Sequence, residues 1–207
     1  MKTLKESILS RSSHGGEGFK AQRREMIESW LKEYNIGNYT ISRDLTIDVD
    51  GDVNLIRKNL TEFPDYIQFG EVSGYFSCSY NNLTSLKGAP KKVEWYFDCS
   101  NNYLTSLKGA PKEVEGYFDC SDNQLTSLEE APIKVGGDFD CSINNLTSLK
   151  GTPEKLTGNF DCGYNQLTSL EGAPKEVGGL FDCSGNSKTF TENDIREVCK
   201  VKKRIYI

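Results

Sequence analysis

A 21-residue repeat dominates the chain and limits what it can fold into. Six cysteines are each 21 residues apart, at Cys78, Cys99, Cys120, Cys141, Cys162 and Cys183. A phenylalanine stands two residues before each cysteine and an asparagine three residues after it, and the prolines from Pro90 to Pro174 keep the same spacing. A constant period of this length predicts a solenoid, because one unit cannot bury its apolar face alone and stacked units share a core.

The residues of one unit predict a short strand followed by a turn. In Phe97-Asp98-Cys99 the first and third side chains share one face, because strand side chains alternate. We expect each repeat asparagine, such as Asn102, to turn its amide inward and bond turn backbone groups. The Gly-Ala-Pro segment cannot continue a helix, so the return path is expected to be extended or 3₁₀-like.

The inward cysteines are predicted to be buried, reduced thiols. No Cys-x-x-Cys pair occurs and no histidine lies near them in the sequence, which argues against a metal site. Side chains in register along a stack point the same way, which suits disulfide geometry poorly. The single histidine, His14, falls in a polar segment that we expect to be flexible, so a Cys–His catalytic pair is not predicted.

The two ends read as caps around the repeats. We expect a flexible segment at residues 1–18, an N-terminal cap at 19–50, the solenoid at 51–187 and a C-terminal cap at 188–207. The first cap is predicted to hold a helix over 19–35, ended by Gly37, and strands at 39–41 and 45–49. A degenerate repeat follows, with Val53, Leu55, Lys58 and Leu60. In the second cap, Thr191-x-x-Asp194 indicates a helix start, Ile195, Val198 and Cys199 share a face, and the tail is expected to add a strand.

The repeat resembles the leucine-rich-repeat family. The family pattern L-x-L-x-x-N-x-L occurs here as F-D-C-S-N-N-Y-L from Phe97 to Leu104 and in its companion repeats, covering roughly residues 45–187. The 21-residue period looks like that of the short leucine-rich repeats found in secreted bacterial effectors. The residue pattern of the repeat also looks like tandem repeats in predicted proteins of gut bacteria and their phages. The resemblance implies a mainly β fold, a leucine-rich-repeat solenoid with a parallel sheet on one face, a helical and β cap before it and a short helical cap after it. Cys and Phe replace Leu in the strand, and the chain has no room for the ligase domain of some such effectors.

Composition excludes several classes of function. The chain has 207 residues with a net charge of −5, which disfavours nucleic-acid binding. No apolar run is long enough for a membrane span and no signal peptide is evident, so we expect a cytoplasmic protein, in a host cytoplasm or a virion if phage-encoded. A nucleophile–base pair, a phosphate loop and a metal cluster are all missing from the sequence, so no enzyme activity, cofactor or metal is predicted.

The outward positions of the strands carry the candidate site. Five successive carboxylates, one per repeat, form a column that is either a solvated acidic stripe or a surface for a basic partner or a cation. The neighbouring positions differ between repeats and are rich in aromatic residues, which indicates either a surface for protein recognition or tolerated drift at unconstrained sites. The predicted partner-binding residues are Tyr75, Trp95, Tyr96, Asp98, Tyr117, Asp119, Asp140, Asp161 and Asp182. The lysines of the turn and return sides are interpreted as a solvated face: Lys87, Lys91, Lys92, Lys108, Lys112, Lys134, Lys150 and Lys175.

The sequence therefore predicts a non-catalytic protein-binding module that uses its exposed strand face. The partner is expected to be a protein with a basic patch, and the chain to be a monomer unless it belongs to an assembly. The alternative is a structural component of a phage particle or cell-envelope assembly, in which the repeats act as a spacer.

Overall fold

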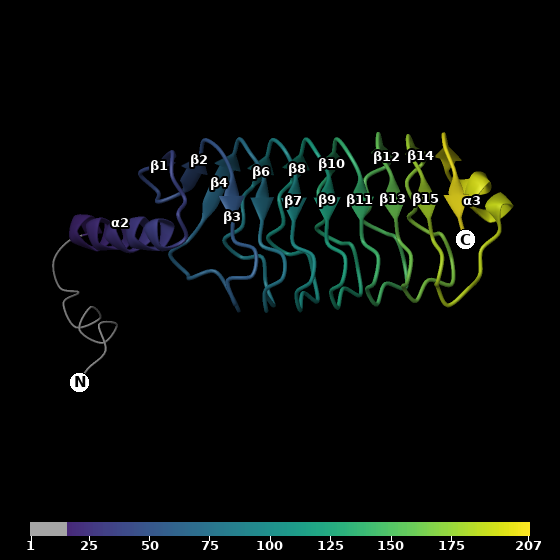
Figure 1. Ribbon diagram of the computed structural model, residues 1–207, viewed down its shortest axis with the longest axis horizontal. Coiled ribbons are helices and arrows are strands. Elements are labelled where there is room, and N and C mark those ends of the chain that lie inside the picture. The colour runs from purple at the N-terminus through teal and green to yellow at the C-terminus, as the bar shows by residue number, and fades with distance from the viewer. Residues whose placement is uncertain (1–15) are drawn as a thin grey trace.

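The computed structural model of the chain describes residues 16–207. Most of the segment 1–18, including His14, lies outside the described residues, and Gly16 already begins helix α2, Gly16–Glu33. After this helix the chain winds into a β-solenoid whose turns stack along one axis (Figure 1). The mainly β solenoid with parallel strands, predicted from the repeat, is confirmed.

Two rows of short strands run along the solenoid. The first, here the Phe-Asp sheet, is eight-stranded. It comprises β3 (Val53–Asn54), β5 (Phe76–Ser77), β7 (Phe97–Asp98), β9 (Phe118–Asp119), β11 (Phe139–Asp140), β13 (Phe160–Asp161), β15 (Phe181–Asp182) and β17 (Ile205–Tyr206). All its neighbouring strands are parallel and in register, so each repeat phenylalanine from Phe76 to Phe181 pairs with its equivalents in adjacent turns.

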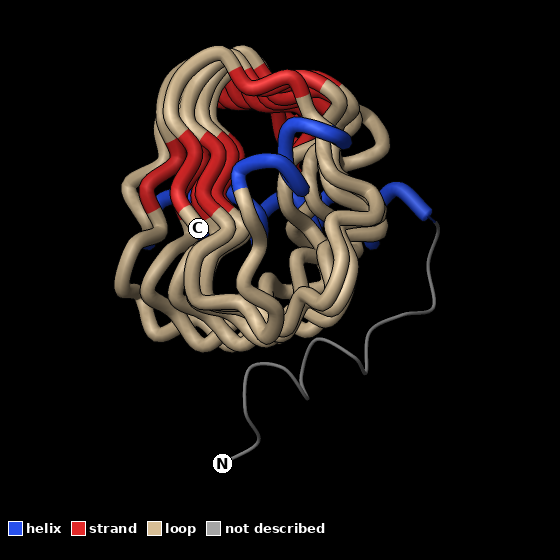
Figure 2. Tube along the Cα trace, turned by 90° about the vertical axis from the view of Figure 1, so that its right-hand side faces the viewer, coloured by secondary structure: helices blue, strands red, loops and turns tan. Residues whose placement is uncertain are grey.

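The return path supplies the second row, here the Lys-Val row. It begins with antiparallel β1 (Tyr39–Ile41) and β2 (Ile47–Val49) and continues in parallel through β4 (Phe69–Val72), β6 (Lys92–Val93), β8 (Glu113–Val114), β10 (Lys134–Val135), β12 (Lys155–Leu156), β14 (Glu176–Val177) and β16 (Lys200–Val201). The row is interrupted between β10 and β12. The extended return path was expected, but the sequence predicted a sheet on one face only. In the end view the two rows occupy different sides of the coil, and a long loop closes each turn (Figure 2).

The core is one continuous column of equivalent side chains. The Phe, Cys, Val and two Leu positions of the central repeat, from Val114 to Leu128, are fully buried. Successive phenylalanine rings lie 5.1–5.9 Å apart between centroids, so the aromatic layer runs unbroken through the solenoid. Burial of this apolar surface is the main stabilising term, at roughly 25 cal/mol per Å².

The repeat cysteines are buried free thiols, as predicted. The Cys120 thiol donates to the Asp140 carbonyl oxygen at 3.3 Å, and the equivalent bond recurs in neighbouring turns. Burial raises the pKa of the Cys120 thiol well above its ordinary value. A thiol that stays protonated is a poor nucleophile and metal ligand, so these cysteines act as small apolar core residues.

A ladder of buried asparagines ties each turn to the one before it. The Asn102 amide nitrogen donates to the carbonyl oxygens of Cys99 at 3.1 Å and of Cys78, in the preceding turn, at 3.0 Å. Its amide oxygen accepts from the Leu83 backbone N–H at 2.9 Å. The same pattern recurs at Asn123, Asn144, Asn165 and Asn186, and at Asn81 against the degenerate repeat. The expected inward orientation is confirmed, and one side chain satisfies backbone groups of two turns.

The caps cover the ends of the apolar column. Ile27, Trp30 and Leu31 of α2 are buried, and the Trp30 ring lies against Phe69 at 6.2 Å between centroids. The helix ends at Glu33, and Asn35 rather than Gly37 terminates it: Asn35 has φ of 55°, and the Ile36 N–H donates to the Leu31 carbonyl oxygen at 2.9 Å. This is a Schellman end, in which asparagine takes the left-handed position that glycine often fills.

The C-terminal cap follows its sequence signals closely. Helix α3 spans Glu192–Val198 and begins at a capping box between Thr191 and Asp194, as predicted. Ile195 and Cys199 are buried, whereas Val198, expected on the same face, is 44% exposed. The tail contributes β16 and β17, one strand to each row.

We expect Asn123→Ala to destabilise the protein by on the order of 2 kcal/mol, because it leaves the buried Leu104 N–H without its acceptor and removes one of the two amide donors to the Cys99 carbonyl oxygen. Ser121→Ala is the matched control, since that hydroxyl bonds only the half-buried Asp119 carboxylate, at 2.7 Å. Urea unfolding of both variants measures the difference. Equal midpoints and slopes would contradict the role assigned to the ladder.

Candidate functional site

The predicted binding residues lie on the outer side of the Phe-Asp sheet and at its corner with the Lys-Val row. Each strand points its phenylalanine into the core, so the residues on either side of it face outward. The structure therefore places Tyr96, Asp98 and their equivalents in two adjacent columns, with Trp95 at the corner that follows β6. All nine predicted residues share this surface, which we call the outer strand face: Tyr75, Trp95, Tyr96, Asp98, Tyr117, Asp119, Asp140, Asp161 and Asp182.

The three tyrosines form a stacked column. The rings of Tyr75 and Tyr96 lie 4.7 Å apart between centroids at 1°, and those of Tyr96 and Tyr117 lie 4.4 Å apart at 7°. Tyr96 therefore has both ring faces covered and is only half-exposed, so it offers a partner its edge and hydroxyl group. Tyr117, at the end of the stack, is 39% exposed and keeps one face free of aromatic neighbours among the described residues.

Trp95 departs from its column. The equivalent position is glycine in five other turns, at Gly74, Gly116, Gly137, Gly158 and Gly179. A Cβ atom at Gly116 would lie 2.4 Å from the Trp95 carbonyl oxygen, and one at Gly158 would lie 2.6 Å from the Gly137 carbonyl carbon. A side chain is thus unfavourable at these two glycines, whereas the equivalent corner in the turn of Trp95 carries an indole that is 63% exposed.

The aspartate column is half-buried rather than fully exposed. The Asp119 Oδ1 atom accepts from the Ser121 backbone N–H at 2.9 Å and from the Ser121 hydroxyl group at 2.7 Å. The same bonds recur at Asp98 and Asp140, and the backbone bond alone at Asp161 and Asp182. One oxygen of each carboxylate thus braces its own turn. The Asp-x-Ser spacing is an Asx-turn signal that the sequence interpretation did not use.

Burial and like charge perturb these carboxylates. Desolvation raises the pKa of Asp119 to about 6, the Ser121 bonds act against this rise, and neighbouring Asp140 and Asp98 add to it. Desolvation likewise raises the pKa of Asp161 to about 6. The second oxygen of Asp119 makes no hydrogen bond with any residue in 16–207, so it stays available to a donor from outside. A partner that brings positive charge would relieve the repulsion within the column.

A further column explains part of the variation seen between repeats. Tyr80, Asn101, Asp122, Ile143 and Tyr164 all have φ between 51° and 54°, in the left-handed region, and Gly185 has φ of 68°. Asn, Asp and Gly suit this conformation, whereas a β-branched residue does not. Ile143 is nevertheless present and is 51% exposed. The column was interpreted as surface variation, and the backbone supplies a constraint that the sequence pattern did not reveal.

Comparison with known proteins leaves the chain without an assigned family: no protein-family model matches it, and no curated protein does. Neither described helix has the length and apolar content that a membrane span requires. Within residues 16–207, His, Cys, Asp and Glu side chains nowhere gather in a group of three that could hold a metal ion.

We expect Asp119→Asn to stabilise the protein at neutral pH by about 1 kcal/mol. The folded-state pKa of about 6 lies above the unfolded value near 4, so the native state binds the proton more tightly. The contribution of this tighter proton binding to the free energy of unfolding is fully present below about pH 4 and is lost as pH rises through about 6. The gain from the substitution should therefore be present at pH 7 and vanish near pH 4, as measured by urea unfolding at both values. Glu62→Gln, at an exposed side chain, controls for the change in net charge. A gain of the same size at both pH values would refute the burial argument.

We expect Ile143→Asn to raise stability by about 1 kcal/mol, because asparagine tolerates the left-handed backbone better. The reverse exchange, Asn101→Ile, should lower stability by a similar amount, since Asn101 has φ of 54°. Thermal or urea unfolding of the two variants checks the pair. If neither midpoint moves, the backbone strain at this column is negligible.

Proposed function

We propose that this protein is a non-catalytic protein-binding module whose partner docks on the outer strand face. The observation that carries the proposal is Trp95, an exposed indole at a corner where five other turns have glycine. An exposed tryptophan contributes little to folding, and at the equivalent Gly116 and Gly158 a Cβ atom would crowd the backbone of the preceding turn. Tryptophan is the side chain most enriched among residues that dominate binding energy at protein interfaces.

The surroundings of Trp95 indicate the partner's chemistry. Tyr117 adds a partly exposed ring, and the aspartate column adds negative charge, including the Asp119 Oδ2 atom that has no donor within residues 16–207. A partner surface with an apolar pocket bordered by Lys or Arg would match both features. Because Tyr96 is stacked on both faces, we assign the anchor role to Trp95 and Tyr117, with Tyr75 and Tyr96 as a rigid support.

We further propose that the turns are a variant of the leucine-rich repeat and that the protein acts as a monomer in the cytoplasm. The inward leucines and the asparagine ladder support the first point. Seven free thiols support a reducing compartment. The alternative, a spacer in a phage particle or cell-envelope assembly, draws on the regular stacking of the turns. It predicts a constant copy number in an isolated particle, whereas a binding module is recovered with a defined soluble partner.

Trp95→Gly tests the proposal with the residue that other turns carry at this corner. We expect the fold to be unchanged or more stable and dissociation from the partner to be about thirtyfold faster, a loss of about 2 kcal/mol. The partner would first be captured with a photo-crosslinking amino acid at position 95, and rates then measured by surface plasmon resonance. Asp119→Asn with Asp140→Asn should slow association and flatten its salt dependence.

Ile133→Ser is the matched control, because Ile133 is 74% exposed but precedes the Lys-Val strand β10 instead of lying on the outer strand face. Its binding rates should equal those of the parent protein. If Trp95→Gly and the double aspartate variant both bind like the parent, the outer strand face is not the docking site.

A further inference from the structure

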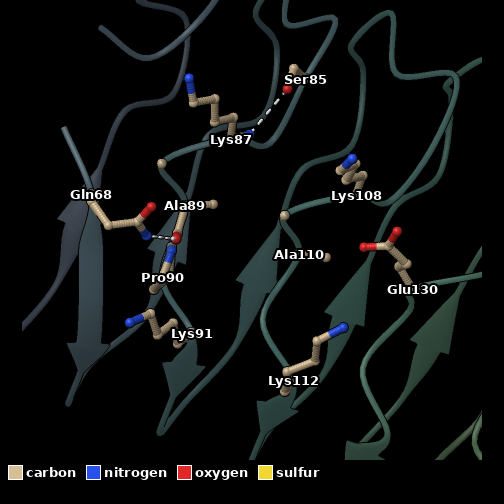
Figure 3. A pocket seen from close by; sticks show the side chains of 12 residues that line it. Gln68, Ser85, Lys87, Ala89, Pro90, Lys91, Lys108, Ala110, Lys112 and Glu130 are labelled. Atoms are coloured by element: carbon tan, nitrogen blue, oxygen red, sulfur yellow. Dashed lines mark hydrogen bonds between the residues drawn. The ribbon is translucent and has the colours of Figure 1, made fainter. Parts of the chain in front are cut away.

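A second surface of the solenoid carries a hollow framed by lysines. The hollow measures about 450 Å³ and lies where the long loop of each turn enters the Lys-Val row. Figure 3 shows Lys87 and Lys108 at one end, Lys91 and Lys112 at the other, and Ala89 and Ala110 between them. Pro90 completes an apolar floor, and Glu130 is the one carboxylate in the lining.

The four lysines come from two successive turns and stack as like charges. The Lys112 backbone N–H donates to the Lys91 carbonyl oxygen at 2.9 Å, so these two residues are direct neighbours along the stack. The backbones of equivalent positions one turn apart lie about 4.8 Å from each other, so each column places like charges on adjacent turns. None of the four forms an ion pair with a carboxylate in residues 16–207.

In later turns, the positions equivalent to these lysines carry other residues as well as lysine. The position of Lys87 and Lys108 recurs as Glu129, Lys150 and Glu171, and the last two form an ion pair at 2.8 Å. The position of Lys91 and Lys112 recurs as Glu154 and Lys175, which pair at 2.6 Å. The last two turns of these columns therefore carry cross-turn ion pairs, whereas the two turns around the hollow carry lysine at both positions.

We propose that this hollow binds an acidic peptide segment, with one apolar side chain on the alanine and proline floor and carboxylates paired to the lysines at both ends. Four ammonium groups without ion-pair partners attract a negatively charged ligand. The apolar floor between them would stay unused by a free phosphate or a phosphate backbone. Among the described residues, 16–207, no aromatic ring on which a nucleic-acid base could stack lines the hollow, which favours a peptide over a nucleic acid.

The site is independent of the outer strand face, because Trp95 and the aspartate column contribute nothing to its lining. Each proposal can therefore fail without the other. The lysines were interpreted as a solvated face from the sequence, where their like-charge stacking in adjacent turns could not be compared with the ion pairs of later turns.

The test is a binding titration of the full chain with a fluorescein-labelled peptide that carries two glutamates on each side of a leucine. We expect Lys87→Glu with Lys91→Glu to weaken binding at least tenfold in fluorescence anisotropy. The same variant should unfold at an equal or higher urea concentration, because it places a carboxylate beside Lys108 and beside Lys112 and so restores the alternation of later turns. A loss of binding in a protein of undiminished stability cannot be ascribed to misfolding.

The matched control is Lys150→Glu with Lys175→Glu, which changes the net charge equally at the same columns but away from the hollow. It should leave the affinity within about twofold, and an equal loss in both variants would reduce the effect to overall charge and overturn the proposal.

A peptide with serine in place of leucine should bind at least threefold more weakly, and equal affinity would show that the floor takes no part. An oligothymidine of the same charge that binds as tightly through the same lysines would assign the hollow to polyanions and overturn the peptide proposal.

Discussion

The asparagine ladder is the interaction on which the rest of the solenoid depends. Every turn must bury a bend of backbone whose N–H and C=O groups have lost water, and no helix or long strand is present there to satisfy them. One inward carboxamide per turn meets this need by bonding Cys and Ser carbonyl groups of its own turn together with a carbonyl and an N–H group of the turn before. Because those bonds demand a constant rise between turns, they also align the phenylalanines, the thiols and the outer columns that form the proposed binding face.

Much of this arrangement could be predicted from the residues alone. The 21-residue period, the inward Phe and Cys and the bonded Asn follow from alternation and from the need to satisfy buried polar groups, and the capping box at Thr191 follows from local chemistry. The second row of strands was missed because two-residue strands such as Lys92–Val93 leave no alternating pattern to read. The half-burial of Asp119 was missed because it depends on a turn that folds back onto its own carboxylate. Cross-turn charge pairing depends on neighbours 21 residues away, so the difference between Lys87 and Lys150 becomes visible only when the turns are stacked.

Departures from the repeat carry more functional information than the repeat itself. A regular unit is already a good solution for folding, so a residue that makes one turn less stable than its neighbours needs another reason to be there. Trp95 at a glycine corner and the like-charged lysines around the hollow are two such departures, and they lie on separate surfaces. Comparison between turns of one chain thus supplies part of the contrast that comparison between relatives would otherwise provide.

The direction of the ladder has a consequence for how the protein is made. Each asparagine reaches back to the preceding turn: Asn186 bonds Cys162 and Leu167, and Asn81 bonds Leu55 and Leu60 of the degenerate repeat, where Lys58 stands at the asparagine position. The asparagine of each turn therefore completes its bonds on the turn made before it, whereas strand N–H groups such as that of Cys99 find their acceptor, the Asp119 carbonyl oxygen, in the turn that follows. During synthesis on the ribosome, where the N-terminus emerges first, every finished turn becomes the template for the next. The helical cap at Trp30 would thus act as the seed, and the chain could grow or shorten by whole units during evolution without rewriting the turns that remain.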